Sequence, residues 1–157
     1  MHAIAVVRVR CAFALLAAVL PAWNALHATP DSLYMRMGGE PVVHAVVSET
    51  LDRVVADHRL NQSFARIDVE RVKRLLVQQI CALAGGGCRY TGDPMREVHA
   101  GHQISESEFY GLVEIMRDSM RRHHVGLRER NQLLALLAPM QHDIVNVPAL
   151  KATSAEP

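Results

Sequence analysis

The chain has 157 residues, of which 50% are hydrophobic, 21% charged and only 4% aromatic. This composition excludes a disordered tail, a collagen-like fibre and a disulfide-dense miniprotein, and it is typical of one domain around a packed core. The 17 basic side chains are balanced by 16 acidic ones, so the formal net charge is +1. No basic field marks the chain as a nucleic-acid-binding protein.

Residues 1–28 have the pattern of a secretory signal peptide. Arg8 and Arg10 precede an apolar run that ends at Pro21, and residues 26–28 suit the usual cleavage positions. We therefore expect a protein exported to the periplasm or the medium, whose mature chain begins near Thr29. The alternative is an uncleaved membrane anchor, but the apolar run is about half of the ~20 residues that a spanning helix needs. After cleavage we expect no stable membrane insertion.

The first two predicted elements are helices. Asp31 and Ser32 can cap a short helix over Leu33–Met37, which two glycines end. Pro41 then lies in the first turn of a second helix, where proline is favoured. Apolar side chains recur there every three or four residues, which indicates a buried stripe. The stripe consists of Val42, Val43, Val46, Val47, Leu51, Val54 and Val55, with Thr50 among them.

A third helix is predicted from the cap at Asp68 to Leu83, with one apolar face, and Gly85-Gly86-Gly87 ends it. Cys81 lies near the end of this helix and Cys88 follows the glycines, and they are the only cysteines left once the signal segment is removed. In an oxidising compartment they can form a local disulfide, because the glycines let the backbone fold back. Two free thiols and half of a metal site are the alternatives, and no nearby ligand set supports the metal.

The segment between Cys88 and Ser105 is predicted to be mostly loop, with one helical turn over Met95–His99. A loop of about seventeen residues is uncommon in a compact domain unless it has a function. The capping-box spacing of Ser105 and Glu108 starts a fourth helix that extends to Met120. A fifth is predicted over Leu127–Val145, and residues 149–157 are expected to be a flexible tail. The sequence thus predicts one all-α domain over 29–148.

Nine histidines are many for this length, and most lie on polar faces or at helix ends. His99 differs, because Met95, Val98 and Ile104 would hold it toward the core. From periodicity alone it is either a hydrogen-bonded inward histidine or a ligand. No catalytic motif competes with it, since Gly-x-Ser-x-Gly, Gly-Lys-Ser and His-Glu-x-x-His are all missing.

Several short runs, weak singly but specific in this order, resemble the truncated haemoglobins of the first group. They are Leu33-Tyr34, Gly38-Gly39-Glu40, residues 53–60, Phe64, Gln79-Ile80-Cys81, residues 86–92 and residues 95–101. The likeness extends from Leu33 to Val145, and it implies a two-over-two α-helical globin sandwich in an exported member of the family. In this fold, most of the usual proximal helix is replaced by loop. The resemblance also implies the cofactor haem b (iron protoporphyrin IX).

The resemblance assigns His99 as the proximal ligand of the haem iron. The other ring nitrogen of His99 would then need a backbone or side-chain acceptor that orients the imidazole. Phe64 corresponds to the phenylalanine that wedges against the macrocycle, and Arg71 or Lys73 could pair with a propionate. The implied apolar and aromatic haem contacts are Met95, Val98, Ile104, Phe109, Val113 and Tyr90.

The distal side departs from the family pattern. Many relatives have a tyrosine and a glutamine where this chain has Leu51 and Leu76, and Val72 lies one turn before Leu76. Gln79 is the one nearby polar group, and it either leans over the ligand or lies at the edge of a buried face. Bound oxygen needs a hydrogen-bond donor more than carbon monoxide does. We therefore expect weak oxygen retention.

The function expected from the sequence is binding of diatomic gases (oxygen, carbon monoxide or nitric oxide) at a five-coordinate iron. A gas-binding protein is favoured over a dedicated enzyme, and the reductant is unknown. One alternative is a haem redox protein, for which a distal acid–base group is missing, or a nitric-oxide-detoxifying protein, which needs a reductant and an oxygen complex that lasts. The other is a globin-like helical binding module without haem.

Overall fold

The computed structural model describes residue 29 and residues 31–147. The predicted signal peptide and the predicted tail lie outside the described residues. Within 31–147 all regular structure is helical. The elements are α1 (Leu33–Arg36), α2 (Gly39–Ala56), the 3-10 turn η1 (Asn61–Phe64), α3 (Val69–Leu83), α4 (Met95–His99), α5 (Glu106–Arg122), α6 (Leu127–Leu137), the 3-10 turn η2 (Ala138–Met140) and α7 (Gln141–Ile144).

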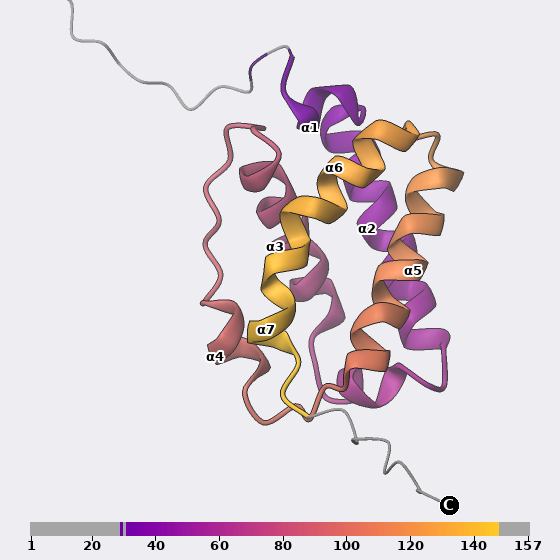
Figure 1. The fold of residues 1–157 in the computed structure, drawn as a ribbon, viewed down its shortest axis with the longest axis vertical. Coiled ribbons are helices and arrows are strands. Elements are labelled where there is room, and N and C mark those ends of the chain that lie inside the picture. The colour runs from indigo at the N-terminus through magenta and orange to yellow at the C-terminus, as the bar shows by residue number, and fades with distance from the viewer. Residues whose placement is uncertain (1–28, 30, 148–157) are drawn as a thin grey trace, which may run out of the picture.

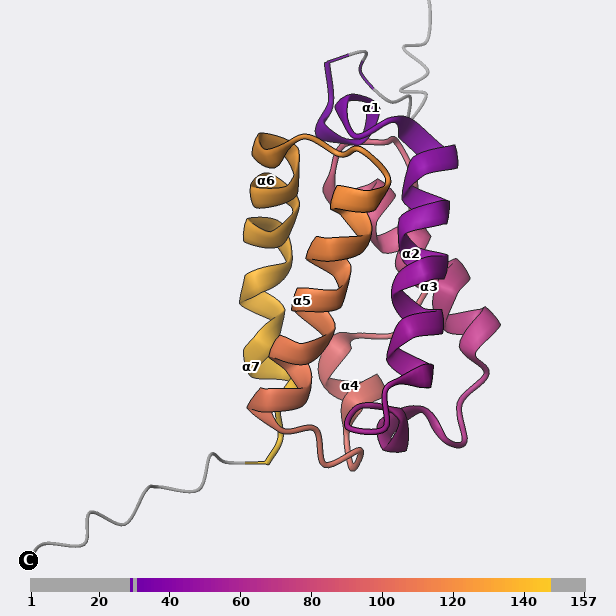
Figure 2. The same ribbon diagram turned by 90° about the vertical axis from the view of Figure 1, so that its right-hand side faces the viewer.

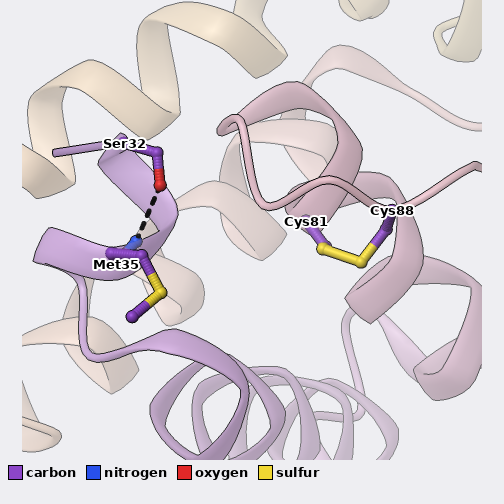
Figure 3. Close-up of a disulfide and its surroundings, with 4 residues drawn as sticks. All are labelled: Ser32, Met35, Cys81 and Cys88. Atoms are coloured by element: carbon purple, nitrogen blue, oxygen red, sulfur yellow. Dashed lines mark hydrogen bonds between the residues drawn. A yellow bond between two sulfur atoms is a disulfide. The ribbon is translucent and has the colours of Figure 1, made fainter. Parts of the chain in front are cut away.

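The predicted caps are confirmed at three helix starts. The Ser32 hydroxyl accepts a hydrogen bond from the Met35 amide in α1 (Figure 3), and the Asp68 carboxylate accepts one from the Arg71 amide in α3. Ser105 opens α5 with a complete capping box. Each cap satisfies amides that the first helical turn leaves without a backbone partner.

The prediction of one continuous helix over Leu127–Val145 is wrong. The structure divides this segment into α6, η2 and α7. Pro139 lies within η2, and proline has no backbone N–H to continue the helical hydrogen bonds. The turn η1 was also not predicted, because four residues are too few to show a periodic pattern.

The core forms around α2, which packs against both α3 and α5. Val43, Val46, Val47 and Leu51 of α2 are almost completely buried, so most of the predicted stripe faces the interior. Val55, which was predicted to belong to it, is 39% exposed. Figures 1 and 2 show α5 and α6 side by side, with α1 at one end of the molecule and α4 toward the other. The residues of α4 and α7 are in contact at that second end.

Candidate functional site

His99 is the last residue of α4 and is partly buried. Its Nδ1 atom lies 2.7 Å from the carbonyl oxygen of Met95, one helical turn earlier. Because a carbonyl oxygen only accepts hydrogen bonds, Nδ1 carries the proton and Nε2 keeps its lone pair. Burial lowers the pKa of His99, although the bond to Met95 opposes this shift. The ring is therefore a neutral, oriented imidazole with one nitrogen available to a metal.

Apolar side chains from η1 and α3 pack against the core, to which α2 contributes Leu51. Leu51 is 1% exposed and belongs to the core itself, and Phe64, Val72 and Leu76 pack against it while remaining partly exposed. Thr50 is buried beside them, but its hydroxyl donates to the Val46 carbonyl oxygen at 2.6 Å. These five side chains offer no free hydrogen-bond donor.

Gln79 is buried on α3 and points away from solvent toward two methionines. Its Nε2 atom lies 3.4 Å from Met95 Sδ and 3.4 Å from Met140 Sδ. A thioether sulfur is a weak acceptor, so this amide is held only loosely. Through these contacts Gln79 links α3 to α4 and to η2. Met140 had not been singled out in the sequence, where it looks like one more apolar residue of the predicted fifth helix.

The apolar residues expected to contact haem are distributed over α4, α5 and the loops beside them. Met95 and Val98 are on α4, Ile104 lies between α4 and α5, and Phe109 and Val113 are on α5. All are at least partly exposed, and Val98 is 38% exposed. Partly exposed apolar side chains of this kind are suited to contact with a large apolar ligand.

The donor set also fits haem. Within residues 31–147 no group of three or more His, Cys, Asp or Glu side chains could hold a metal ion. A lone imidazole cannot complete a coordination shell by itself. It suits a metal that arrives in a macrocycle with its own nitrogen ligands. The residues present therefore fit haem better than a bare ion.

The two cations expected at a propionate have different surroundings. Lys73 Nζ lies 2.7 Å from Asp52 Oδ1 on α2 and 2.7 Å from Glu70 Oε1, so its charge is already paired. Arg71 is exposed and forms no ion pair with any described residue. Its positive charge opposes the rise that burial causes in the pKa of Tyr90. Tyr90 itself donates its hydroxyl hydrogen to the Asp93 carbonyl at 3.3 Å.

A disulfide joins Cys81 and Cys88, whose Cα atoms are 5.6 Å apart (Figure 3). Gly86 lies between them, and a Cβ atom there would be 2.5 Å from Cys81 Sγ and 2.7 Å from the Tyr34 ring. The Tyr34 amide also donates to the Ala84 carbonyl oxygen at 2.9 Å. The disulfide therefore closes the loop after α3, and the Tyr34–Ala84 hydrogen bond joins the end of α3 to α1. From there the chain runs along the molecule to α4 (Figure 1).

Two surface hollows flank α7, and neither is lined by His99 or by any residue of α3. His99 is thus a candidate iron ligand because of its chemistry, and not because it lines a surface hollow. No described helix is long and apolar enough to cross a membrane.

Comparisons with known proteins show the family of the chain. Residues 32–146 match the family of bacterial-like globins. A group 1 truncated hemoglobin from Mycolicibacterium paratuberculosis is 32% identical over 126 residues, which cover 80% of this chain and 93% of that protein. Another from a Nostoc species is 27% identical over 116 residues, covering 74% and 98% of the two chains.

The structure of truncated hemoglobin from Tetrahymena pyriformis in the Fe(III) form superposes with a TM-score of 0.70. It is 23% identical, and the match covers 73% of this chain and 98% of that one. The all-α, two-over-two globin fold expected from the sequence is confirmed. The chain belongs to the bacterial-like globin family as a truncated globin, which implies a haem cofactor and a gas ligand.

Proposed function

We propose that this globin binds haem b through Nε2 of His99 and binds oxygen, carbon monoxide or nitric oxide in an apolar distal pocket. The observation that carries the proposal is the 2.7 Å contact between His99 Nδ1 and the Met95 carbonyl oxygen. It fixes both the tautomer and the direction of the ring before any metal binds. Haem supplies the iron at which the gas is held.

The side chains of the proposed distal pocket act by excluding water. Leu51, Phe64, Val72 and Leu76 provide an apolar surface that keeps water away from the bound gas. Without a donor among them, a ligand that gains negative charge receives no hydrogen bond. We propose weaker oxygen retention, and a lower preference for oxygen over carbon monoxide, than in relatives that have a distal tyrosine and glutamine.

Haem would be held without covalent bonds from cysteine. The sequence contains no Cys-x-x-Cys-His attachment motif, and Cys81 and Cys88 are bonded to each other. Arg71, with no described ion-pair partner, is the better candidate for a propionate, because Lys73 is already paired with Asp52 and Glu70. Haem should therefore be extractable by a competing apoglobin.

We also propose that the protein acts outside the cytoplasm. The charged and apolar pattern of residues 1–28 supports export, and the disulfide is compatible with an oxidising compartment. The mass of the protein recovered from a periplasmic extract tests this proposal. A mature chain that begins near Thr29 supports it, and an intact Met1 in the cytoplasmic fraction contradicts it.

The central experiment compares absorption spectra of the wild-type protein, His99→Ala and His102→Ala after loading with haem. His102 is the matched control, because it is an exposed histidine three residues away. We expect stoichiometric haem and a Soret shift on adding carbon monoxide for the wild type and the control. His99→Ala should lose this spectrum and regain it with imidazole. Failure of the folded wild-type protein to bind haem would favour a haem-free helical module.

A further inference from the structure

The helix α4, which ends at His99, has only five residues. A helix this short has no stability of its own in water, since nucleation costs more than one turn of hydrogen bonds returns. Its position must therefore come from contacts with the rest of the chain. The only described helix with an extensive contact to α4 is α7, near the C-terminal end of the domain.

Two side chains beyond η2 contact α4 directly. Asp143 Oδ1 accepts hydrogen bonds from Arg96 Nε at 3.1 Å and from Arg96 Nη2 at 2.7 Å. Asn146 Nδ2 donates to the backbone carbonyl oxygen of His99 at 2.7 Å. The first contact holds the start of α4, and the second holds the residue assigned to the iron.

The backbone also fixes Asn146 in place. The amides of Asn146 and Val147 both donate to the Ile104 carbonyl oxygen, at 3.0 and 3.2 Å. Ile104 belongs to the segment that follows α4, so the chain on both sides of His102 is tied to the same few C-terminal residues. We call Asp143, Asn146 and Val147 the C-terminal clamp.

The carbonyl of His99 is one of those that a helix end leaves without an intrahelical partner. It accepts a hydrogen bond from the His102 amide at 3.2 Å and a shorter one from Asn146. A side chain 47 residues further along the sequence thus caps the helix that carries the ligand. Any displacement of Asn146 moves the backbone from which the imidazole projects.

We propose that the C-terminal clamp is a positioning device for His99, which sets the orientation of the imidazole at the haem iron. This inference rests on the proposed ligation of haem by His99. Asn146 acts through the His99 carbonyl and Asp143 acts through Arg96, so neither touches the iron. The clamp makes the last residues that the structure describes part of the support of the proposed iron ligand.

The test uses the full-length protein with Asn146→Ala, and Glu114→Ala as the control. Glu114 pairs with Arg117 on the exposed side of α5, so its removal deletes a surface hydrogen bond away from α4. The first measurement is millisecond hydrogen–deuterium exchange over residues 96–104, before and after haem loading. Loss of one hydrogen bond predicts about fivefold faster exchange in Asn146→Ala and no change in Glu114→Ala.

The second measurement is the iron–histidine stretching band of the ferrous, ligand-free protein by resonance Raman spectroscopy. We expect the band to shift or broaden in Asn146→Ala at an unchanged melting temperature, which a merely structural role would not produce. Each of the single substitutions Arg96→Asp and Asp143→Arg should raise the hydrogen–deuterium exchange rates of α4. The double variant, which swaps the two charges, should restore them.

The outcomes separate the inference from the proposed function. If the wild-type protein takes up haem and Asn146→Ala changes neither exchange nor the band, the clamp has no positioning role while the proposed function stands. If the wild-type protein takes up no haem, the proposed function fails and this inference fails with it.

Discussion

His99 and Met95 are joined across one turn of α4 by a contact of 2.7 Å between Nδ1 and the carbonyl oxygen. The acceptor is a backbone atom, so side-chain substitution at Met95 does not remove it. The pKa of His99 lies below its ordinary value of 6.5, chiefly because the ring is partly buried. The folded protein therefore holds this side chain in the neutral form that metal binding requires.

The free energy of unfolding of the haem-free protein should fall as the pH decreases below about 6.5, the ordinary pKa of histidine. In this window the unfolded chain binds a proton at His99 and the folded chain does not, so acid favours unfolding. His99→Gln, which stays neutral, should lack this part of the pH dependence. Urea unfolding of both proteins from pH 5 to 8 measures it, and parallel curves for the two would contradict the assignment.

Opening the disulfide between Cys81 and Cys88 should destabilise the fold. The closed loop is short, since the cysteines are seven residues apart, and the chain-entropy model predicts a loss of about 2–3 kcal/mol in the free energy of unfolding. Cys81→Ala/Cys88→Ser and the reduced wild-type protein should show the same loss. A reductant should not affect the double variant, and a further loss there would mean that the reductant acts elsewhere.

Local features of this chain were predictable from the sequence because they depend on neighbouring residues. The caps at Asp68 and Ser105 act within three positions of themselves, so spacing alone is enough to predict where α3 and α5 begin. The single turn at Met95–His99 was found for the same reason. The expected apolar haem contacts rest on the family resemblance and stay a prediction, since no periodic pattern marks the full set.

The contacts that position α4 could not be predicted in this way. Asn146 reaches the His99 carbonyl across 47 residues, and nothing near Asn146 in the sequence indicates that partner. The prediction of an unbroken helix to Val145 also missed the 3-10 turn at Pro139, which separates α6 from α7. The pairing of Lys73 with Asp52 is equally a product of packing between α2 and α3.

Arg71→Ala and Lys73→Ala should have different effects. Arg71→Ala is expected to speed transfer of haem to a competing apoglobin by about two- to fivefold, the effect of one exposed charge pair, while unfolding of the haem-free protein stays the same. Lys73→Ala removes the bonds to Asp52 and Glu70 and should lower the free energy of unfolding by up to about 1 kcal/mol. The reverse result would assign the propionate to Lys73.

Leu76→Gln should slow the dissociation of oxygen. Leu76 lies on α3 among partly buried apolar side chains, and glutamine of similar length would bring an N–H donor among side chains that have none. A hydrogen bond to a ligand that carries negative charge contributes about 1.5–3 kcal/mol, which corresponds to roughly ten- to a hundredfold slower release. Carbon monoxide, which gains less charge, should be affected much less.

Leu76→Met is the control for this substitution, because it keeps the length of the side chain and adds no N–H donor. Stopped-flow measurement of oxygen and carbon monoxide dissociation from the three proteins separates polarity from size. If Leu76→Met slows oxygen release as much as Leu76→Gln, the pocket acts through its shape. If neither changes it, Gln79 would be the next side chain to replace, since its amide rests only on the sulfurs of Met95 and Met140 and could turn toward the bound gas.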